Sequence, residues 1–292
     1  MRPKDCTIRI NGLPLHYLDW NRESGYPEPG EAALLLHGMS GNAHVWDRFA
    51  PKLASHMRTL ALDLRGHGES GWASPPAYKA ADYTGDIPCL LDGAGIAHAV
   101  IAAHSMSVYH AIRYAVDHPD RVRRMVLIDI EAKGRPEHKL MLNAGGLKPQ
   151  PVFTSVEEAV ARERRNAPHA PDDLLQDFVR HNLRDAESGE SSPGLTYRYD
   201  RATLAEFDYY DERENLRRIG CRVLLIYGKQ SPAVSPQVIH EMARAIPTAE
   251  VAGIEPAGHL PHLDNPEAFE RAVLPFCRGE RDDAGFFQDD QS

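Results

Sequence analysis

Short, almost uninterrupted apolar runs alternate with helical stretches along most of the chain, and this alternation is what most constrains the fold. The apolar runs are ALLL (33–36), TLALDL (59–64), AVIAA (99–103), MVLIDI (125–130) and VLLIY (223–227). Helices are expected between them, at 45–55, 87–96, 107–117 and 236–245. Strands that are apolar on both faces are typical of a parallel sheet covered by helices on each side. The pattern therefore predicts an α/β fold with a mostly parallel, twisted sheet.

The two ends of the chain depart from this alternation. Near the N-terminus, TIRI and LPLHYLDW flank the pair Asn11-Gly12, which predicts an antiparallel hairpin. A strand at 250–254 and a helix at 266–276 close the pattern. Residues 280–292 are acidic and rich in residues that break regular structure, so we expect a flexible tail there.

The alternation stops between residues 133 and 218. Two helical stretches lie inside this interval, VEEAVARERR at 156–165 and DDLLQDFVRHNL at 172–183. We interpret the interval as a helical lid inserted between two strands of the sheet. The expected organisation is thus a core in two parts, 1–132 and 219–279, with a lid at 133–218.

The composition narrows the class of partner. A formal net charge of -9 disfavours a general attraction to nucleic acid or to an anionic membrane surface. No apolar run approaches the roughly 18 residues that cross a bilayer, and the N-terminus carries no apolar export signal. The four cysteines show no metal-ligand spacing, so we expect a cytoplasmic protein without a metal or cofactor that acts on a small molecule, its oligomeric state being left open.

Polar motifs follow the predicted strands at their carboxyl ends, where an open parallel sheet presents its working residues. In chain order they are His37-Gly38-Met39-Ser40-Gly41, Asp63-Leu64-Arg65-Gly66-His67-Gly68, His104-Ser105-Met106, Asp129, and Ala257-Gly258-His259. Each motif is weak by itself, but their order along the chain is specific. The chain resembles the α/β-hydrolase superfamily, and the resemblance covers nearly everything outside the lid and tail.

Ser105 is the candidate nucleophile. It lies at a predicted strand-to-helix turn, where its hydroxyl would be raised above the edge of the sheet. The alternative is that Ser105 only caps a helix, and the neighbouring motifs favour the nucleophile. The glycines that usually stand two residues to either side are replaced by Ala103 and Ser107, which are small enough to keep the turn.

The base and the acid follow from the same resemblance. His259 comes after a glycine at the end of the last strand, where the family carries its base, and His262 is the nearest competitor. The family's usual acid position, three residues after Gly228, holds Ser231. Some branches take the acid instead from the end of the strand after the nucleophile helix, which here gives Asp129, with Glu131 as the alternative.

These assignments predict a serine hydrolase. His259 would take the Ser105 proton while Asp129 holds the imidazole in place. By resemblance, the backbone N–H groups of Met39 and Met106 would form the oxyanion hole. Hydrolysis of a carboxylic ester or lactone is the favoured reaction class. Hydrolysis of an activated carbon–carbon bond or of an amide-like bond is an open alternative.

The substrate pocket is less defined by the sequence. Trp46, His104 and Tyr209 are candidate lining residues, and for Trp46 an ordinary core role is an equal alternative. Two rival functions also remain. One is a cofactor-free dioxygenase that uses only a His259–Asp129 dyad, and the other is a non-catalytic ligand-binding protein on the same fold.

Overall fold

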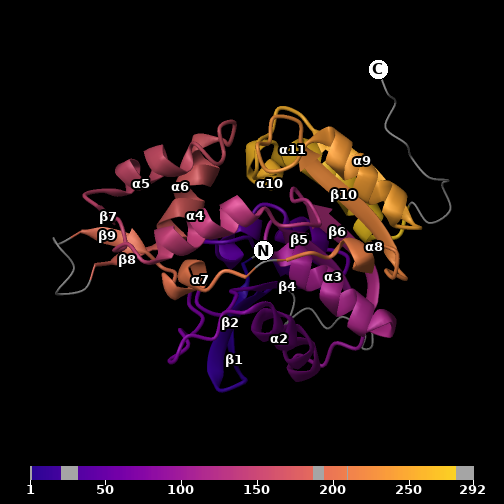
Figure 1. Cartoon of the computed structure of the whole chain (residues 1–292), viewed down its shortest axis with the longest axis horizontal. Helices are drawn as coiled ribbons and strands as arrows, with labels where there is room; N and C mark the ends of the chain where they lie inside the picture. Colours follow the sequence, from indigo (N-terminus) through magenta and orange to yellow (C-terminus); the bar gives the residue numbers. More distant parts are fainter. Residues whose placement is uncertain (1, 21–31, 187–193, 209, 281–292) are drawn as a thin grey trace.

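A sheet of eight strands forms the centre of the molecule, in the order β1-β2-β4-β3-β5-β6-β10-β11 (Figure 1). This computed structural model describes residues 2–20, 32–186, 194–208 and 210–280. The strands are β1 (Lys4–Ile10), β2 (Leu13–Asp19), β3 (Ala32–Leu36), β4 (Arg58–Leu62), β5 (Ala99–His104), β6 (Val122–Ile128), β10 (Arg222–Gly228) and β11 (Ala249–Ile254). Pairing is antiparallel in β1-β2 and β2-β4 and parallel between all the other neighbours. The predicted sheet and its N-terminal hairpin are confirmed.

The hairpin turn shows why the sequence folds as it does at this end. Asn11 and Gly12 have φ angles of 48° and 84°. A two-residue turn with positive φ at both positions matches the twist of the strands that it joins, and Asn-Gly is the pair best suited to it. The turn therefore sets the register in which Ile10 faces Leu13.

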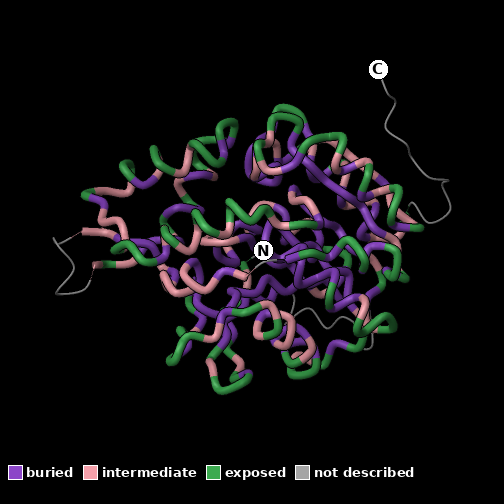
Figure 2. Tube along the Cα trace, in the orientation of Figure 1, coloured by how far each residue is buried: buried purple, intermediate pink, exposed green. Residues whose placement is uncertain are grey.

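Helices cover both faces of the sheet. One face packs against α2 (Ala80–Gly93), α3 (Ser107–Asp117) and α9 (Pro236–Ala245). The other packs against the 3-10 helix η1 (Ala43–Trp46), α1 (Ala50–Ala54) and α11 (Pro266–Cys277). Side chains alternate along each strand, so that Leu34 belongs to the first core and Leu35 to the second. Figure 2 shows buried residues along the central strands and exposed ones on the outer turns of the helices.

Helix boundaries match the expectation in some places and not in others. The helices α3 and α9 have the predicted bounds. The helix expected at 45–55 is divided into η1 and α1, and that expected at 87–96 begins earlier, at Ala80. There the Asp82 carboxylate accepts the Lys79 N–H at 2.8 Å and caps the helix, so that Pro88 lies within α2 rather than at its start.

The segment between β6 and β10 forms a separate layer, on the left of Figure 1 for most of its length. It contains α4 (Pro136–Gly146), β7 (Val152–Phe153), α5 (Val156–Glu163), α6 (Asp172–His181), β8 (Leu183–Asp185), β9 (Leu195–Tyr197), α7 (Ala202–Ala205) and α8 (Arg213–Leu216). The predicted helices are joined by a small antiparallel sheet, β7-β9-β8, which the sequence did not indicate. The last helix, α8, packs against α3 and α9 of the core, so the layer that we call the lid ends before it.

No helix among the described residues is both long and apolar enough to cross a membrane. The predicted tail, 280–292, falls outside the described residues except for Glu280. The short elements η2 (Pro119–Arg121) and α10 (Pro261–Asp264) lie at the start of β6 and just before α11.

Candidate active site

The turn between β5 and α3 carries Ser105 in a left-handed conformation. Its φ is 52°, a value that favours glycine and that other residues adopt only when the surrounding structure imposes it. The Ser105 N–H donates to the carbonyl of Ile128 at 2.9 Å. This bond ties the turn to the end of the neighbouring strand β6, so the raised position of the Ser105 hydroxyl is built into the sheet.

The residues that replace the usual glycines around this turn fit without loosening it. Ala103 and Ser107 are both fully buried. The Ser107 hydroxyl donates to the carbonyl of His37 at 2.5 Å, and the His37 ring in turn accepts the Leu64 N–H at 3.0 Å. The added hydroxyl therefore links the first turn of α3 to the loop after β3, a contact that the sequence did not indicate.

Three side chains from distant parts of the chain meet in a hydrogen-bonded relay. The Nε2 atom of His259 lies 3.0 Å from the Ser105 hydroxyl, and its Nδ1 atom lies 2.7 Å from Oδ2 of Asp129. A carboxylate beside Nδ1 keeps the proton on that nitrogen, which leaves Nε2 free to accept the serine proton. The structure thus brings Ser105, His259 and Asp129 together in the order that nucleophilic catalysis needs.

Asp129 is buried and receives two hydrogen bonds from the end of β10. Its φ is 56°, and its N–H donates to the Ile226 carbonyl at 2.8 Å. Its Oδ1 accepts the Gly228 N–H at 2.8 Å, and its Oδ2 accepts the Ser231 hydroxyl at 2.5 Å. Ser231 therefore does more than leave the usual acid position empty, because it binds the carboxylate that stands one strand away.

The loop after β3 approaches Ser105 closely because residue 38 is glycine. A Cβ atom on Gly38 would lie 2.7 Å from Nδ1 of His104 and 2.9 Å from Cβ of Ser105. The loop then turns through Ser40, whose φ is 61°, while the Gly41 N–H donates to the Gly38 carbonyl at 3.1 Å. The backbones of Met39 and Met106, the two predicted oxyanion donors, consequently run beside Ser105.

Two other histidines, His104 and His262, lie near His259 and are neutral. His104 is buried and bonds through Nε2 to the His259 carbonyl at 2.8 Å. Burial and the nearby rings of His259 and His262 lower the pKa of His104 well below its ordinary value. Burial and then the proximity of His259 lower the pKa of His262 to about 3. The His104 ring packs against His259, and the His262 ring packs against His104. Of these three histidines, only His259 hydrogen-bonds to both Ser105 and Asp129.

The remaining predicted residues lie in different surroundings. The Glu131 carboxylate pairs with Arg135 at 2.5 Å, so the geometry favours Asp129 over the alternative acid. Trp46 is fully buried and stacks on His262 with ring centroids 4.7 Å apart, which agrees with its core role rather than with contact to a ligand. Tyr209 lies outside the described residues.

One group of side chains among the described residues has the composition of a metal site. Ligand atoms of His44, Asp47 and His181 lie within 4.8 Å of one another. The two imidazoles are stacked, however, with centroids 3.6 Å apart and planes inclined by 12°. The lone pairs of a ring nitrogen lie in the ring plane, so parallel rings direct them side by side and not toward one ion. We assign no metal to this group.

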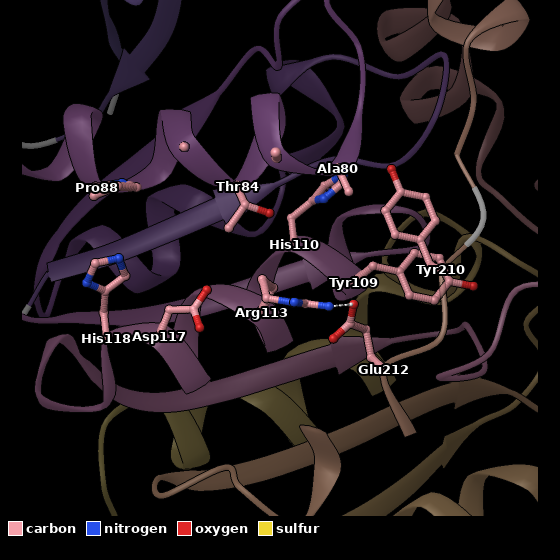
Figure 3. A pocket seen from close by; sticks show the side chains of 12 residues that line it. Ala80, Thr84, Pro88, Tyr109, His110, Arg113, Asp117, His118, Tyr210 and Glu212 are labelled. Carbon is pink, nitrogen blue, oxygen red and sulfur yellow. Dashed lines mark hydrogen bonds and ion pairs between the residues drawn. The ribbon is translucent and has the colours of Figure 1, made fainter. Parts of the chain in front are cut away.

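A cavity of about 440 Å³ lies between α2 and α3, apart from the relay (Figure 3). His110 and Tyr109 line it from α3, and Arg113 pairs with Glu212 beside it at 2.9 Å. Burial lowers the pKa of His110 to about 3, so that this ring is neutral. None of Ser105, Asp129 and His259 lines this cavity.

The chain is similar to known proteins over most of its length. Over 263 residues, the chain is 26% identical to 2-(acetamidomethylene)succinate hydrolase of Mesorhizobium japonicum, covering 87% of this chain and 90% of the relative. It is 25% identical to N-formylmaleamate deformylase of Pseudomonas putida, covering 92% and 94%. The crystal structure of an enol-lactonase from Burkholderia xenovorans superposes with a TM-score of 0.74 at 24% identity, covering 93% of this chain and 99% of the other.

The family follows from a match that spans most of the core. A sequence model of the alpha/beta hydrolase fold matches residues 34–266, an interval that contains Ser105, Asp129 and His259. One of the relatives is named a hydrolase and another a deformylase, and the resemblance seen in the strand-end motifs is confirmed. This chain belongs to the alpha/beta hydrolase fold family.

Proposed function

We propose that the protein is a serine hydrolase that cleaves a small carboxylic ester or lactone through an acyl-enzyme. The observation that carries the proposal is the relay in which His259 bonds to Ser105 at 3.0 Å and to Asp129 at 2.7 Å. A nucleophile, a base and an orienting carboxylate in hydrogen-bond contact are what acyl transfer requires.

The mechanism follows from these contacts. His259 accepts the Ser105 proton through Nε2 as the serine oxygen attacks the substrate carbonyl. Asp129 stabilises the imidazolium that forms, and the N–H groups of Met39 and Met106 receive the developing oxyanion. His259 then protonates the leaving group. In the second half of the reaction, His259 accepts a proton from the water that attacks the acyl-enzyme and returns it to the Ser105 oxygen.

A serine at the turn separates this chemistry from its rivals. A dioxygenase that used only the dyad of His259 and Asp129 would not need a hydroxyl bonded to Nε2. A protein that only bound a ligand would not need the complete relay. The 3.0 Å contact between Ser105 and His259 therefore favours hydrolysis over both.

A second substrate class has its own support. Two of the relatives are named 2-(acetamidomethylene)succinate hydrolase and N-formylmaleamate deformylase, and these names refer to acyl groups on nitrogen. The same relay can cleave such a bond, because His259 can protonate a nitrogen leaving group as it does an oxygen. Amide-like substrates therefore belong beside esters and lactones in the first screen.

The test combines labelling with a substrate panel. We expect a fluorophosphonate to modify Ser105 of the wild-type protein, and p-nitrophenyl esters, small lactones or N-formyl amides to be hydrolysed. Ser105→Ala should abolish labelling and lower kcat by about 10⁴-fold or more. Unlabelled protein that consumes oxygen with an N-heteroaromatic substrate would favour the dioxygenase. Tight ligand binding without any turnover would favour the binding protein.

A further inference from the structure

We propose that Asn182, at the end of lid helix α6, is a positioning residue that holds the oxyanion loop in its working conformation. The oxyanion loop is defined here as residues 37–41. The inference rests on the proposed function, and it adds that the lid takes part in catalysis through a hydrogen bond to the backbone of this loop. Neither the strand-end motifs nor the relay requires such a residue.

The first half of the oxyanion loop is held by the core. The His37 carbonyl accepts the Ser107 hydroxyl at 2.5 Å, and the His37 Nδ1 atom bonds to the Gly38 carbonyl at 2.7 Å. Gly38 also lies directly against Ser105 and His104. These contacts fix the loop as far as Gly38. Beyond it, the turn has one bond of its own, in which the Gly41 N–H donates to the Gly38 carbonyl at 3.1 Å.

The second half of the loop contains its strained residue. Ser40 has a φ of 61°, and a residue other than glycine in this region carries a conformational cost of about 1 kcal/mol or more. A position of this kind persists only where neighbouring contacts hold it. Because Ser40 directly follows Met39, a change in its backbone would move the Met39 N–H that is to receive the oxyanion.

The Ser40 carbonyl itself is held by a contact from the lid. The Asn182 amide donates from Nδ2 to the Ser40 carbonyl at 2.8 Å. Its Oδ1 atom accepts from Nδ2 of Asn42 at 3.2 Å. A carbonyl can only accept, so the NH₂ group of Asn182 must face Ser40, and the orientation of the amide is settled. Both asparagines are buried, where a hydrogen bond is worth most and its loss costs most.

Asn182 is itself held firmly. Its N–H donates to the Val179 carbonyl at 3.0 Å within the last turn of α6, and its carbonyl accepts the Arg198 N–H at 2.8 Å. Next to it, the ring of His181 stacks on His44. The end of α6 is therefore fixed on the core beside η1, and Asn182 can transmit the position of the lid to the loop.

The test compares Asn182→Ala with a matched lid variant, Asn143→Ala. Asn143 also donates its amide to backbone carbonyls, those of Leu204 and Ala205 at 2.9 and 2.6 Å, but these contacts stay within the lid. Turnover of p-nitrophenyl acetate and the rate of fluorophosphonate labelling would be measured for both variants, with the thermal midpoint as a measure of folding.

We expect Asn182→Ala to lower kcat and the labelling rate about 10- to 100-fold with KM changed by less than about threefold. This lies below the loss of about 10² to 10³ for removal of an oxyanion donor itself. Asn143→Ala should lose thermal stability but keep its labelling rate. The inference is overturned if Asn182→Ala keeps more than about half of the wild-type rate, or if Asn143→Ala loses as much.

A milder variant covers the case in which Asn182→Ala does not fold. Asn42→Asp keeps the oxygen that accepts the His44 N–H at 2.9 Å but cannot donate to Asn182. We expect it to turn the Asn182 amide away from Ser40 and to slow labelling, and an unchanged rate would contradict the inference. If the Ser105→Ala variant were as active as the wild-type protein, the proposed function would be overturned instead. The two failures are therefore distinguishable.

Discussion

The ends of β6 and β10 lie side by side, and they contribute differently to the orientation of His259. The two strands pair in parallel with Ile128 opposite Ile226. The end of β6 supplies the carboxylate, Asp129, whereas the end of β10 supplies only donors to it, the Gly228 N–H and the Ser231 hydroxyl. The two ends lie beside one another because the carboxyl ends of neighbouring parallel strands meet at one edge of the sheet.

The difference between the two ends shows what an acid at the end of β6 needs. Asp129 adopts a left-handed backbone that turns its side chain toward His259, and a conformation of that kind needs support from its neighbours. The β10 end provides the support through two hydrogen bonds. Position 231 carries no acid in this chain, but its serine is a hydrogen-bond partner of the acid at position 129.

The largest effect is expected from a substitution that breaks the relay at the β6 end. Asp129→Asn should lower kcat by about 10⁴-fold, because an amide no longer holds the correct tautomer of His259. Glu131→Gln, its matched control two residues away, removes a carboxylate that pairs with Arg135 and should keep nearly full activity. Steady-state kinetics with the best ester of the panel would measure both. Full activity of Asp129→Asn together with an inactive Glu131→Gln would reverse the assignment.

Moving the carboxylate back to β10 is the next test. Asp129→Ser removes the acid, and adding Ser231→Asp returns a carboxylate to the neighbouring strand end. The double variant should recover about 10- to 100-fold in kcat over Asp129→Ser alone, because the returned carboxylate can again hold the tautomer of His259. Equal rates for the single and the double variant would mean that the β10 end cannot orient His259.

Acid should destabilise the protein through the buried histidines around this site. The pKa of His262 lies at about 3 in the folded protein, below its ordinary value of about 6.5. The unfolded chain therefore binds a proton that the folded one does not, and stability present above pH 6.5 is lost as the pH falls toward 3. Urea unfolding would measure the free energy of unfolding at pH 7.5 and at pH 5. Between these two pH values, it should fall by about 2 kcal/mol less in His262→Phe than in the wild type. Equal losses would contradict the assigned shift.

Removing the donor from β10 should have a smaller effect on turnover. Ser231→Ala deletes the 2.5 Å bond to Asp129, and a bond to a charged group is worth about 1.5 to 3 kcal/mol. Part of this loss should appear in kcat, as a fall of about 10-fold. Ser235→Ala is the control, since it removes the cap of α9 and should affect the thermal midpoint but not kcat. No difference in kcat between the two variants would show that Ser231 does not support the acid.

The smallest effect is expected at the nucleophile turn, away from both strand ends. Ala103→Gly restores a glycine that the family usually carries, and we expect kcat within about threefold of wild type. Ala103 is fully buried, so a small loss of stability is expected from the added flexibility. A sharp rise in activity would show that the native turn is less well formed than the geometry of Ser105 indicates.

Local signals explain which parts of the site could be predicted from the sequence. Ser105 and His259 lie in short motifs at strand ends, and Asp129 was indicated by the serine at position 231. The strands β7, β8 and β9 are only two or three residues long, too short to produce a pattern. The helix expected at 87–96 begins earlier, at Ala80, because the Asp82 carboxylate caps it there, and Pro88 lies in its interior.

The sequence by itself determined the sheet, its hairpin and the nucleophile turn, because alternating apolar runs and turn residues act over a few neighbouring positions. Only the tertiary structure decided that Ser231 donates to Asp129, that Ser107 joins α3 to the loop after β3, and that Asn182 reaches Ser40. Each of these bonds joins residues that are 70 or more positions apart. The sequence does not show which group a short polar side chain will bond to. The partner is determined in the folded protein, where a buried side chain has one polar group within hydrogen-bond distance.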